Sequence, residues 1–170
     1  MNRAEVITVV SGLPRSGTSM MMAMLEAGGM PVLVDHERRP DEDNPRGYYE
    51  FERVKAIETD RDWLEAARGK AVKMVSALLV HLPPGYHYKV LFMRRAIEEV
   101  LASQRAMLAR YGRANRGVSD AEMAAGFTRH LDTVQAWLAG RPHIGVLDVP
   151  YREVVERPLE QASRIAAFLD

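Results

Sequence analysis

Apolar and polar stretches alternate along the chain in a way that predicts strands and helices in turn. Apolar, largely β-branched runs bounded by Gly, Pro or charged residues are typical of buried strands. Such runs lie at 6–10, 31–34, 70–75, 88–93 and 144–149. Helical patterns separate several of them, and strands joined by helical crossovers run parallel. We therefore expect a three-layer α/β/α domain around a mostly parallel central sheet of about five strands.

Apolar side chains at helical spacing predict the covering helices. A first helix includes 20–25 and stops at Gly28-Gly29, and a second passes through Val54 and Ile57. Ser119-Asp120-Ala121-Glu122 is a capping box that would open a long helix, and Pro158 fits the first turn of the last one. The predicted core faces are Ile97, Val100, Leu101, Met107 (or Leu108) and Tyr111; Phe127, Leu131, Val134 and Leu138; and Ala162, Ile165, Ala166 and Leu169.

Composition and charge narrow the class of protein. The 170 residues are 47% hydrophobic and 27% charged, which suits one domain, 1–170, with a single core. Its 23 basic and 23 acidic residues cancel, so no global charge favours nucleic acid or an anionic membrane. There is no cysteine, which excludes disulfides and thiol catalysis. Since no signal peptide or membrane-spanning run is present, we expect a cytoplasmic protein; no oligomeric state follows from the sequence.

The link between the first strand and the first helix carries the strongest chemical signal. Two glycines, Gly12 and Gly17, bracket it, and hydroxyl side chains follow the second glycine. A glycine loop at a helix N-terminus exposes N–H groups and suits an anion, as in a P-loop. Thr18 stands where a nucleoside-triphosphate P-loop has its lysine, while Arg15 places a cation inside the loop. The pattern indicates a P-loop NTPase-like fold with a site for a phosphate-like group, but not ordinary ATP hydrolysis.

This loop resembles the 5′-phosphosulfate-binding loop of the sulfotransferases. The resemblance rests on the string Pro14-Arg15-Ser16-Gly17-Thr18-Ser19, in which a basic residue precedes Ser-Gly-Thr and a second hydroxyl. A simple strand-to-helix turn is the alternative, but a turn does not require this set of side chains. The resemblance implies that 3′-phosphoadenosine 5′-phosphosulfate (PAPS) is the sulfuryl donor. It also implies that Pro14, Arg15, Ser16, Gly17, Thr18 and Ser19 bind its phosphosulfate end.

A second segment resembles the 3′-phosphate site of the same family. Arg95 follows a predicted strand, with Glu99 and Ser103 four and eight residues later, which is the family spacing. The usual Asn-Pro after the arginine is replaced by Ala96-Ile97, so the match is partial. A guanidinium and a hydroxyl suit a terminal phosphate. The alternative is that these are solvated residues at a strand end.

The last strand leads into a third segment with family character. Tyr151, Pro158 and the run 165–169 occur in the order that the sulfotransferases show. In the family this tyrosine approaches the nucleotide, which makes Tyr151 a candidate cofactor-binding residue; an ordinary packing tyrosine is equally consistent with the sequence. The family's C-terminal segment that closes over the nucleotide has no counterpart here. The basic stretch 110–117 could substitute for it.

The resemblance implies transfer of a sulfuryl group to a hydroxyl or amine of a small-molecule or glycan acceptor. No metal is expected, because Arg15 and the loop amides supply positive charge. Lys73 corresponds to the lysine of the cytosolic members' Lys-Thr-His, but Val75 replaces the histidine that acts as base. Other branches use a glutamate, so Glu50 is our first candidate base and, with Arg15 and Lys73, a candidate catalytic residue. Glu52 and His36 are the next candidate bases. The alternative for Glu50 is an exposed glutamate at a helix N-terminus with no catalytic role.

Two other functions stay open. A P-loop kinase or nucleotide hydrolase would use Asp148, at the end of the last strand, to direct magnesium. The missing lysine after Gly17 counts against this alternative. The second open function is that of a non-catalytic nucleotide-binding module. The uncertain identity of the base and the absent closing loop favour it.

Overall fold

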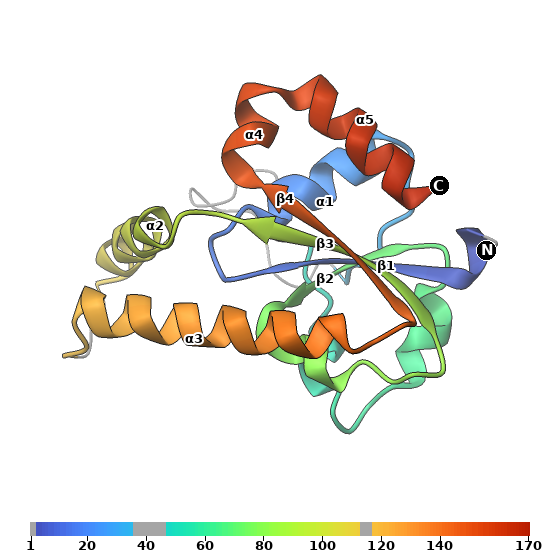
Figure 1. Ribbon diagram of the computed structural model, residues 1–170, viewed down its shortest axis with the longest axis horizontal. Helices are drawn as coiled ribbons and strands as arrows, with labels where there is room; N and C mark the ends of the chain where they lie inside the picture. The colour runs from blue at the N-terminus through green and yellow to red at the C-terminus, as the bar shows by residue number, and fades with distance from the viewer. Residues whose placement is uncertain (1–2, 36–46, 113–116) are drawn as a thin grey trace.

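The computed structural model describes residues 3–35, 47–112 and 117–170 and has the expected α/β architecture (Figure 1). In the described residues one parallel sheet of four strands has the order β2-β1-β3-β4. The strands are β1 Val6–Gly12, β2 Ala71–Val75, β3 His87–Arg94 and β4 Ile144–Pro150. The α-helices are α1 Thr18–Ala27, α2 Ile97–Arg110, α3 Asp120–Ala139, α4 Tyr151–Glu156 and α5 Pro158–Leu169. Short 3₁₀ helices are η1 Arg3–Glu5, η2 Glu52–Ala56, η3 Asp62–Ala67 and η4 Ser76–His81.

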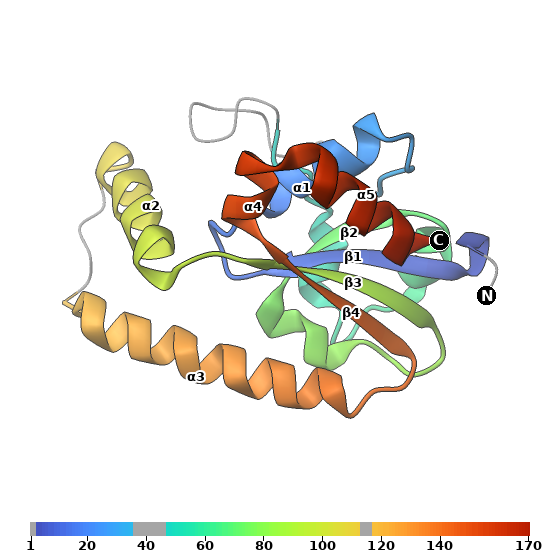
Figure 2. The ribbon, with the colours of Figure 1, turned by 45° about the horizontal axis from the view of Figure 1, so that its top comes forward.

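Helices cover both faces of the sheet (Figures 1 and 2). Side chains alternate across a strand, so Val9 and Val90 enter one core and Val10 and Leu91 the other. The first core is closed by α3 and η2–η4, the second by α1, α4 and α5. The α2 helix differs from the others because it projects beyond the carboxyl end of β3. The chain is therefore a three-layer, P-loop-like α/β protein with its glycine loop between β1 and α1.

The register brings several chain segments to one edge of the sheet. Gly12, the last residue of β1, pairs with Val75 on one side and with Met93 on the other. Arg94 pairs with Pro150, directly before α4. Because all these strands are parallel, the loop after β1, the start of α2 and the start of α4 meet at this edge. Ligands of open α/β sheets bind at this position.

Two predicted elements are wrong in kind. The strand expected at 31–34 is reduced to an isolated bridge between Val32 and Ala71, since Pro31 has no N–H to donate. The helix expected through Val54 and Ile57 is two 3₁₀ helices, η2 and η3, separated by a turn at 57–59.

Two predicted core faces are correct only in part. In α5 the predicted Ile165 and Leu169 are buried, whereas the predicted Ala162 and Ala166 are exposed. Gln161 is buried in addition, because its side chain donates to Glu153 of the preceding helix at 2.9 Å. Within α2 only Val100 and Leu101 are buried. The outer part of α2 lies beyond the sheet. The short helix α4 was not predicted at all.

The longest helix, α3, begins at the predicted capping box. The Ser119 hydroxyl accepts the Glu122 N–H at 3.2 Å, and the Glu122 carboxylate accepts the Ser119 N–H at 2.9 Å. Val134 and Leu138 of the predicted stripe are buried against the sheet. No helix in the described ranges is both long and apolar enough to cross a bilayer.

Replacement of the capping serine tests this helix start. Ser119→Ala should lower the free energy of unfolding at pH 7 by about 1 kcal/mol, because an N–H of the first turn loses its acceptor. Urea denaturation measures the loss. Ser163→Ala is the matched control, since the Ser163 hydroxyl only donates to the Leu159 carbonyl within α5. Equal losses for the two variants would contradict the capping role.

The same cap predicts a pH dependence. Hydrogen bonds from the side chain and backbone of Ser119 lower the pKa of the Glu122 carboxyl. A lowered pKa in the folded state stabilises the fold above the ordinary glutamate pKa and is lost as pH falls through the lowered value. The difference between wild type and Ser119→Ala should therefore shrink in acid. A constant difference down to pH 3 would argue against a charged partner for the cap.

Candidate functional site

The glycine loop folds back tightly after β1. At Gly12 φ is 149°, and an added Cβ would lie 2.5 Å from the Ser16 hydroxyl and 2.8 Å from the Met93 carbonyl oxygen. The Ser16 N–H closes the turn by donating to the Leu13 carbonyl at 3.2 Å. The Ser16 side chain is buried beneath the loop, and in the described part of the chain its hydroxyl has no partner. Glycine at 12 is thus required by space as well as by conformation.

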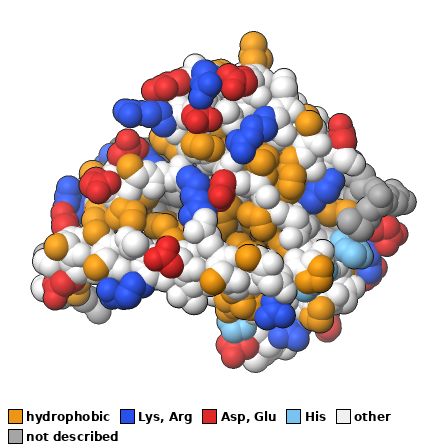
Figure 3. Space-filling view, in the orientation of Figure 1, with side chains coloured by type: hydrophobic (Ala, Val, Ile, Leu, Met, Phe, Trp, Pro, Cys, Tyr) orange, Lys and Arg blue, Asp and Glu red, His pale blue; other side chains and the backbone are white. Residues whose placement is uncertain are grey.

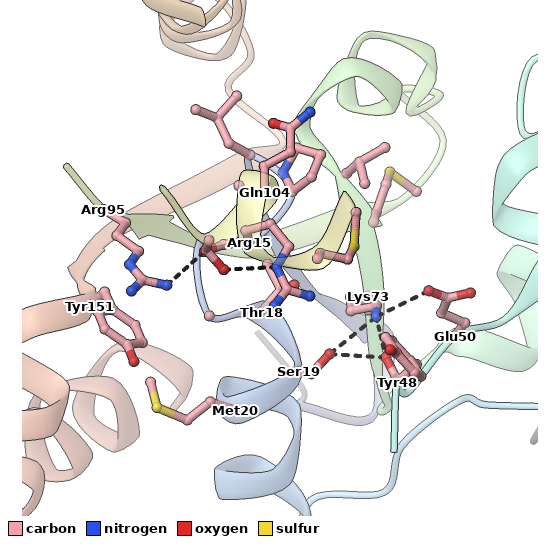
Figure 4. Close-up of a pocket in the computed structure, with 18 residues that line it drawn as sticks. Arg15, Thr18, Ser19, Met20, Tyr48, Glu50, Lys73, Arg95, Gln104 and Tyr151 are labelled. Carbon is pink, nitrogen blue, oxygen red and sulfur yellow. Dashed lines mark hydrogen bonds and ion pairs between the residues drawn. The ribbon is translucent and has the colours of Figure 1, made fainter. Parts of the chain in front are cut away.

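Arg15 holds the loop to α2. Its φ is 68°, a left-handed conformation that a non-glycine residue seldom adopts and that surrounding contacts must stabilise. The Arg15 Nε donates to the Ser103 hydroxyl at 3.0 Å, and the Arg15 carbonyl accepts from Arg95 Nη1 at 3.0 Å. Figure 4 shows the contact between Arg95 and Arg15. The backbone carbonyl and the side chain of Arg15 therefore hold the loop to two residues that follow β3, namely Arg95 and Ser103.

Arg95 is fixed on three sides and retains donor capacity. Its Nε donates to Glu99 at 3.0 Å, Nη1 to Arg15, and its guanidinium carbon lies 4.2 Å from the Tyr151 ring centroid. The side chain is 21% exposed. Its Nη2 group makes no hydrogen bond to any residue that the structure describes. A preorganised, partly buried guanidinium with open N–H groups suits an oxyanion.

Tyr151 packs directly on the glycine loop. It is the first residue of α4, and an added Cβ at Gly17 would lie 2.6 Å from its Cδ2. Gly17 is also the N-cap residue of α1, with φ at 98°. The second loop glycine is therefore needed both for its conformation and for the approach of the aromatic ring.

A second polar cluster lies on the β2 side of the loop. The Lys73 ammonium lies 3.7 Å from Glu50 Oε1 and 3.3 Å from the Ser19 hydroxyl, and it donates to the Tyr48 carbonyl. Ser19 also donates to that carbonyl at 3.2 Å. Lys73 pairs with Val10 in the sheet register, so its strand adjoins β1. The cluster joins the hydroxyl of the loop to the predicted base through one lysine (Figure 4).

The segment carrying Glu50 is anchored to α1. Tyr49 adopts φ 51°, again a left-handed conformation, and its hydroxyl donates to Glu26 at 2.7 Å. Tyr48 is buried, and its carbonyl faces Lys73 and Ser19. This geometry presents Glu50 to the site although it lies in no helix or strand.

These groups line one open pocket of about 520 Å³. Its volume is in the range of small-molecule sites. Among the described residues, the charged lining consists of three cations, Arg15, Lys73 and Arg95, and one carboxylate, Glu50. Basic and acidic side chains are interspersed over the face that Figure 3 shows, and the formal net charge of the protein is zero. The described part of the lining therefore carries more positive than negative charge, which favours an anion.

The structure brings together the predicted site residues with one exception. Ser16 is buried under the loop and does not line the pocket. The other predicted residues do line it: Pro14, Arg15, Gly17, Thr18, Ser19, Glu50, Lys73, Arg95, Ser103 and Tyr151. The alternative bases are not placed there: Glu52 does not line it and accepts from Lys55 at 2.6 Å, and His36 lies outside the described residues. Residues 113–116 of the basic stretch 110–117 likewise lie outside them.

Several lining residues were missed by sequence reasoning. They are Leu13, Met20, Tyr48, Met74, Val75, Gln104 and Met107. Gln104 and Met107 follow Ser103 at helical spacing, a signal that could have placed them. Tyr48 contributes through its carbonyl, for which the sequence gives no signal.

Asp148, the magnesium ligand of the kinase alternative, lies elsewhere. Its carboxylate accepts from Arg94 at 2.7 Å and lines a different hollow, between β4 and α3. No acidic residue on β3 or β4 lines the loop pocket. The geometry therefore does not support the role that the kinase alternative gave to Asp148.

Comparisons with known proteins add little to the site. No family model matches the chain, and no curated protein matches it. Among solved structures, a gluconokinase from Sinorhizobium meliloti 1021 is similar over 99% of this chain and 97% of that one, at 20% identity and a TM-score of 0.36. Similarity at this level assigns no activity.

Gly17 offers a direct test of the loop geometry. Gly17→Ala should reduce the free energy of unfolding by about 1–3 kcal/mol more than Gly29→Ala, because only the first variant forces a Cβ into the Tyr151 ring. Gly29 is the matched control: its φ is 85°, but nothing lies within 4 Å of an added Cβ. Thermal or urea unfolding measures both. The double variant Gly17→Ala/Tyr151→Ala should recover part of the difference, and no recovery would mean that the ring is not the obstacle.

Proposed function

We propose that the loop pocket binds PAPS and that the protein is a sulfotransferase. The observation that carries the proposal is the convergence of Arg95 and Ser103 on Arg15, which they follow by 80 and 88 positions in the sequence. The resemblance assigns these residues to the two charged ends of one nucleotide, so their proximity around one pocket supports it. A chance similarity of separate segments would not require them to meet.

The residues present fit a 3′,5′-substituted nucleotide. The loop leads into the N-terminus of α1, where backbone N–H groups suit an anion. Arg15, Thr18 and Ser19 would bind the phosphosulfate end. The open Nη2 of Arg95, next to Ser103, would bind the 3′-phosphate, with the Tyr151 ring holding the guanidinium in place. Each ionic contact of this kind is charge-assisted.

The Lys73–Glu50 pair supplies the acceptor chemistry in this proposal. When bound, PAPS provides a sulfuryl group: an O–S or N–S bond to the acceptor forms as the S–O bond to the 5′-phosphate breaks, and its electron pair leaves with the bisphosphate. Glu50 takes the acceptor's proton. Lys73, 3.7 Å away, positions that carboxylate and balances its charge. Arg15 and the loop amides stabilise the charge that develops on the leaving phosphate.

Phosphoryl transfer from magnesium-ATP is a second candidate. One observation favours it: Lys73 brings an ammonium to within 3.3 Å of the Ser19 hydroxyl, although the loop itself has no lysine. That ammonium would stand in for the P-loop lysine. The position of Asp148 counts against it. The two candidates differ in their ligand: the first requires a 3′-phosphate and no metal, the second a γ-phosphate and magnesium.

Calorimetric titration separates the candidates. The protein is titrated with 3′,5′-bisphosphoadenosine (PAP), and in parallel with ATP with and without magnesium. Preference for PAP that does not depend on magnesium supports the sulfotransferase. Preference for magnesium-ATP overturns it in favour of the kinase. Binding of PAP without turnover of PAPS on any acceptor would leave a nucleotide-binding module.

Arg95 and its neighbour Arg94 form a matched pair for the 3′-phosphate. Arg95→Ala should raise the Kd for PAP about 10- to 100-fold, because a charge-assisted contact to phosphate is lost. The Kd for AMP, which has a 3′-hydroxyl, should change less. Arg94→Ala should leave both unchanged, since Arg94 pairs with Asp148 away from the pocket. An equal loss of affinity for PAP and for AMP in Arg95→Ala would rule out the 3′-phosphate role of Arg95.

Glu50 and Glu52 form a similar pair for the base. Glu50→Gln should lower kcat for sulfuryl transfer about 10²- to 10⁴-fold, the range for loss of a general base, with the Kd for PAP unchanged. Glu52→Gln should retain activity, because that carboxylate binds Lys55 outside the pocket. Steady-state rates and PAP titration measure the two effects. A Glu50→Gln enzyme with full kcat would remove Glu50 from the mechanism.

A further inference from the structure

The outer edge of β4 has no strand beside it among the residues that the structure describes. β4 is the last strand in the order β2-β1-β3-β4 and lies between the layer of α3 and that of α5 (Figures 1 and 2). The described residues that flank the two gaps in the chain lie elsewhere: 31–35 runs beside β2, at the opposite edge, and Gly112 and Gly117 lie near the outer ends of α2 and α3. An open strand edge is a template for pairing with another strand.

The sheet register shows which backbone groups of β4 face this edge. The Tyr88 N–H donates to the His143 carbonyl at 2.9 Å, and Tyr88 pairs with Ile144. In a parallel ladder the odd-numbered residues of β4 therefore bond to β3, whereas the N–H and C=O groups of Val146 and Asp148 point outward. No described residue gives these outward groups a backbone partner. The edge thus offers an unused row of donors and acceptors to a further strand.

A partly apolar hollow lies along the same edge. It has a volume of about 340 Å³ and lies between β4 and the last turns of α3. Val146 lines it and is 38% exposed, whereas Phe92 and Leu138, which also line it, are buried. An exposed valine between an open ladder and a hollow favours a partner that supplies both a strand and apolar side chains.

The edge is complementary to itself when two copies run antiparallel. Pro142 and Pro150, which have no N–H to donate, each lie four residues from Val146 and bracket the stretch that can pair. A twofold axis at Val146 therefore places Val146 opposite its own copy and Ile144 opposite Asp148. In the first pair each N–H meets the other carbonyl, and in the second the Asp148 N–H meets the Ile144 carbonyl. Such an interface uses the same surface of both copies and closes at a dimer.

The charges at the two ends of the stretch match in this arrangement. The Arg141 carbonyl accepts the Ile144 N–H at 3.0 Å, so a tight turn holds their Cα atoms within about 7 Å. With Ile144 opposite the partner's Asp148, the exposed Arg141 side chain comes within reach of that exposed carboxylate. Within one copy Asp148 accepts from Arg94, and the Arg141 guanidinium stacks on Trp137 at 4.7 Å. Symmetry forms the new ion pair twice, once at each end of the interface.

We propose that β4 pairs with β4 of a second copy of this chain, so that a homodimer forms with one sheet running through both copies. The hollows of the two copies then meet across the axis, and the partner's Val146 covers each of them. No described residue lines both this hollow and the glycine-loop pocket, so the interface leaves that pocket accessible. The proposal does not depend on the proposed function.

Cysteine cross-linking tests the pairing directly, because the chain has no cysteine of its own. Val146→Cys places two thiols opposite each other on the axis, where the Cα atoms of the pair are about 5.5 Å apart, a distance that a disulfide spans. Under copper–phenanthroline oxidation this variant should form covalent dimer at least about 10-fold faster than Val80→Cys. Val80, on η4, is the matched control, since it is also 38% exposed but does not line the hollow. Equal rates would overturn the β4 pairing.

Sedimentation equilibrium measures the dimer itself. At micromolar concentration the wild type and Val80→Lys should have twice the mass of the chain, and Val146→Lys should be a monomer. Arg141→Glu and Asp148→Lys should each raise the dimer Kd about 10-fold or more, because each variant sets like charges against each other at both ends of the interface. An equal mixture of these two variants should recover the dimer, since opposite charges meet only in the mixed pair. A monomeric wild type, a dimer that withstands Val146→Lys, or a mixture without recovery would contradict the proposal.

Discussion

The hydrogen bond between Arg95 and the Arg15 carbonyl is the contact on which the site depends. It stabilises a left-handed arginine in the glycine loop, and it forms only because β1 and β3 are neighbours in the sheet. With the carbonyl held, the Arg15 side chain reaches Ser103, and Arg95 is pressed against Tyr151. The strain of the loop is thus balanced by contacts from the segment that follows β3, in which Arg95 is itself held by Tyr151 at the start of α4. A loop held in this way is preorganised for an anion before the anion arrives.

The position of the site is set by the carboxyl ends of the parallel strands, whereas the arrangement of its side chains is set by the contacts between them. The apolar runs of β1, β2, β3 and β4 and the glycine spacing were enough to predict these four strands and the loop, whereas Arg95 was assigned to the same site only by the resemblance. The bridge at Val32 and the burial of Gln161 in α5 were not predictable, because they depend on single hydrogen bonds and on the unpredicted helix α4. Burial of the Ser16 hydroxyl is likewise a consequence of the tight turn at Gly12 and not of composition.

Residue type alone also hides the second polar cluster. The resemblance pointed to Lys73 and Glu50 separately, but Lys73 and Ser19 also share the carbonyl of Tyr48, which any residue could provide. In a similar way, Met107 and Tyr111 have the spacing of a core face, and hydrophobic periodicity does not tell a buried position from an exposed one. The difference arises from the direction of α2, which projects beyond the sheet, so that only Val100 and Leu101 in it are buried.

The cation beside Glu50 and an exposed apolar residue of the same pocket come from one strand. Lys73 and Val75 are two residues apart in β2, so their side chains point to the same face, about 7 Å from each other along the strand. A one-residue shift in the pairing of β2 with β1 would exchange the face of Lys73 and Val75 with that of the buried Val72 and Met74. Such a shift would bury the Lys73 ammonium among apolar side chains and separate it from Glu50. The pairing register of β2 therefore decides whether Glu50 has a cation beside it.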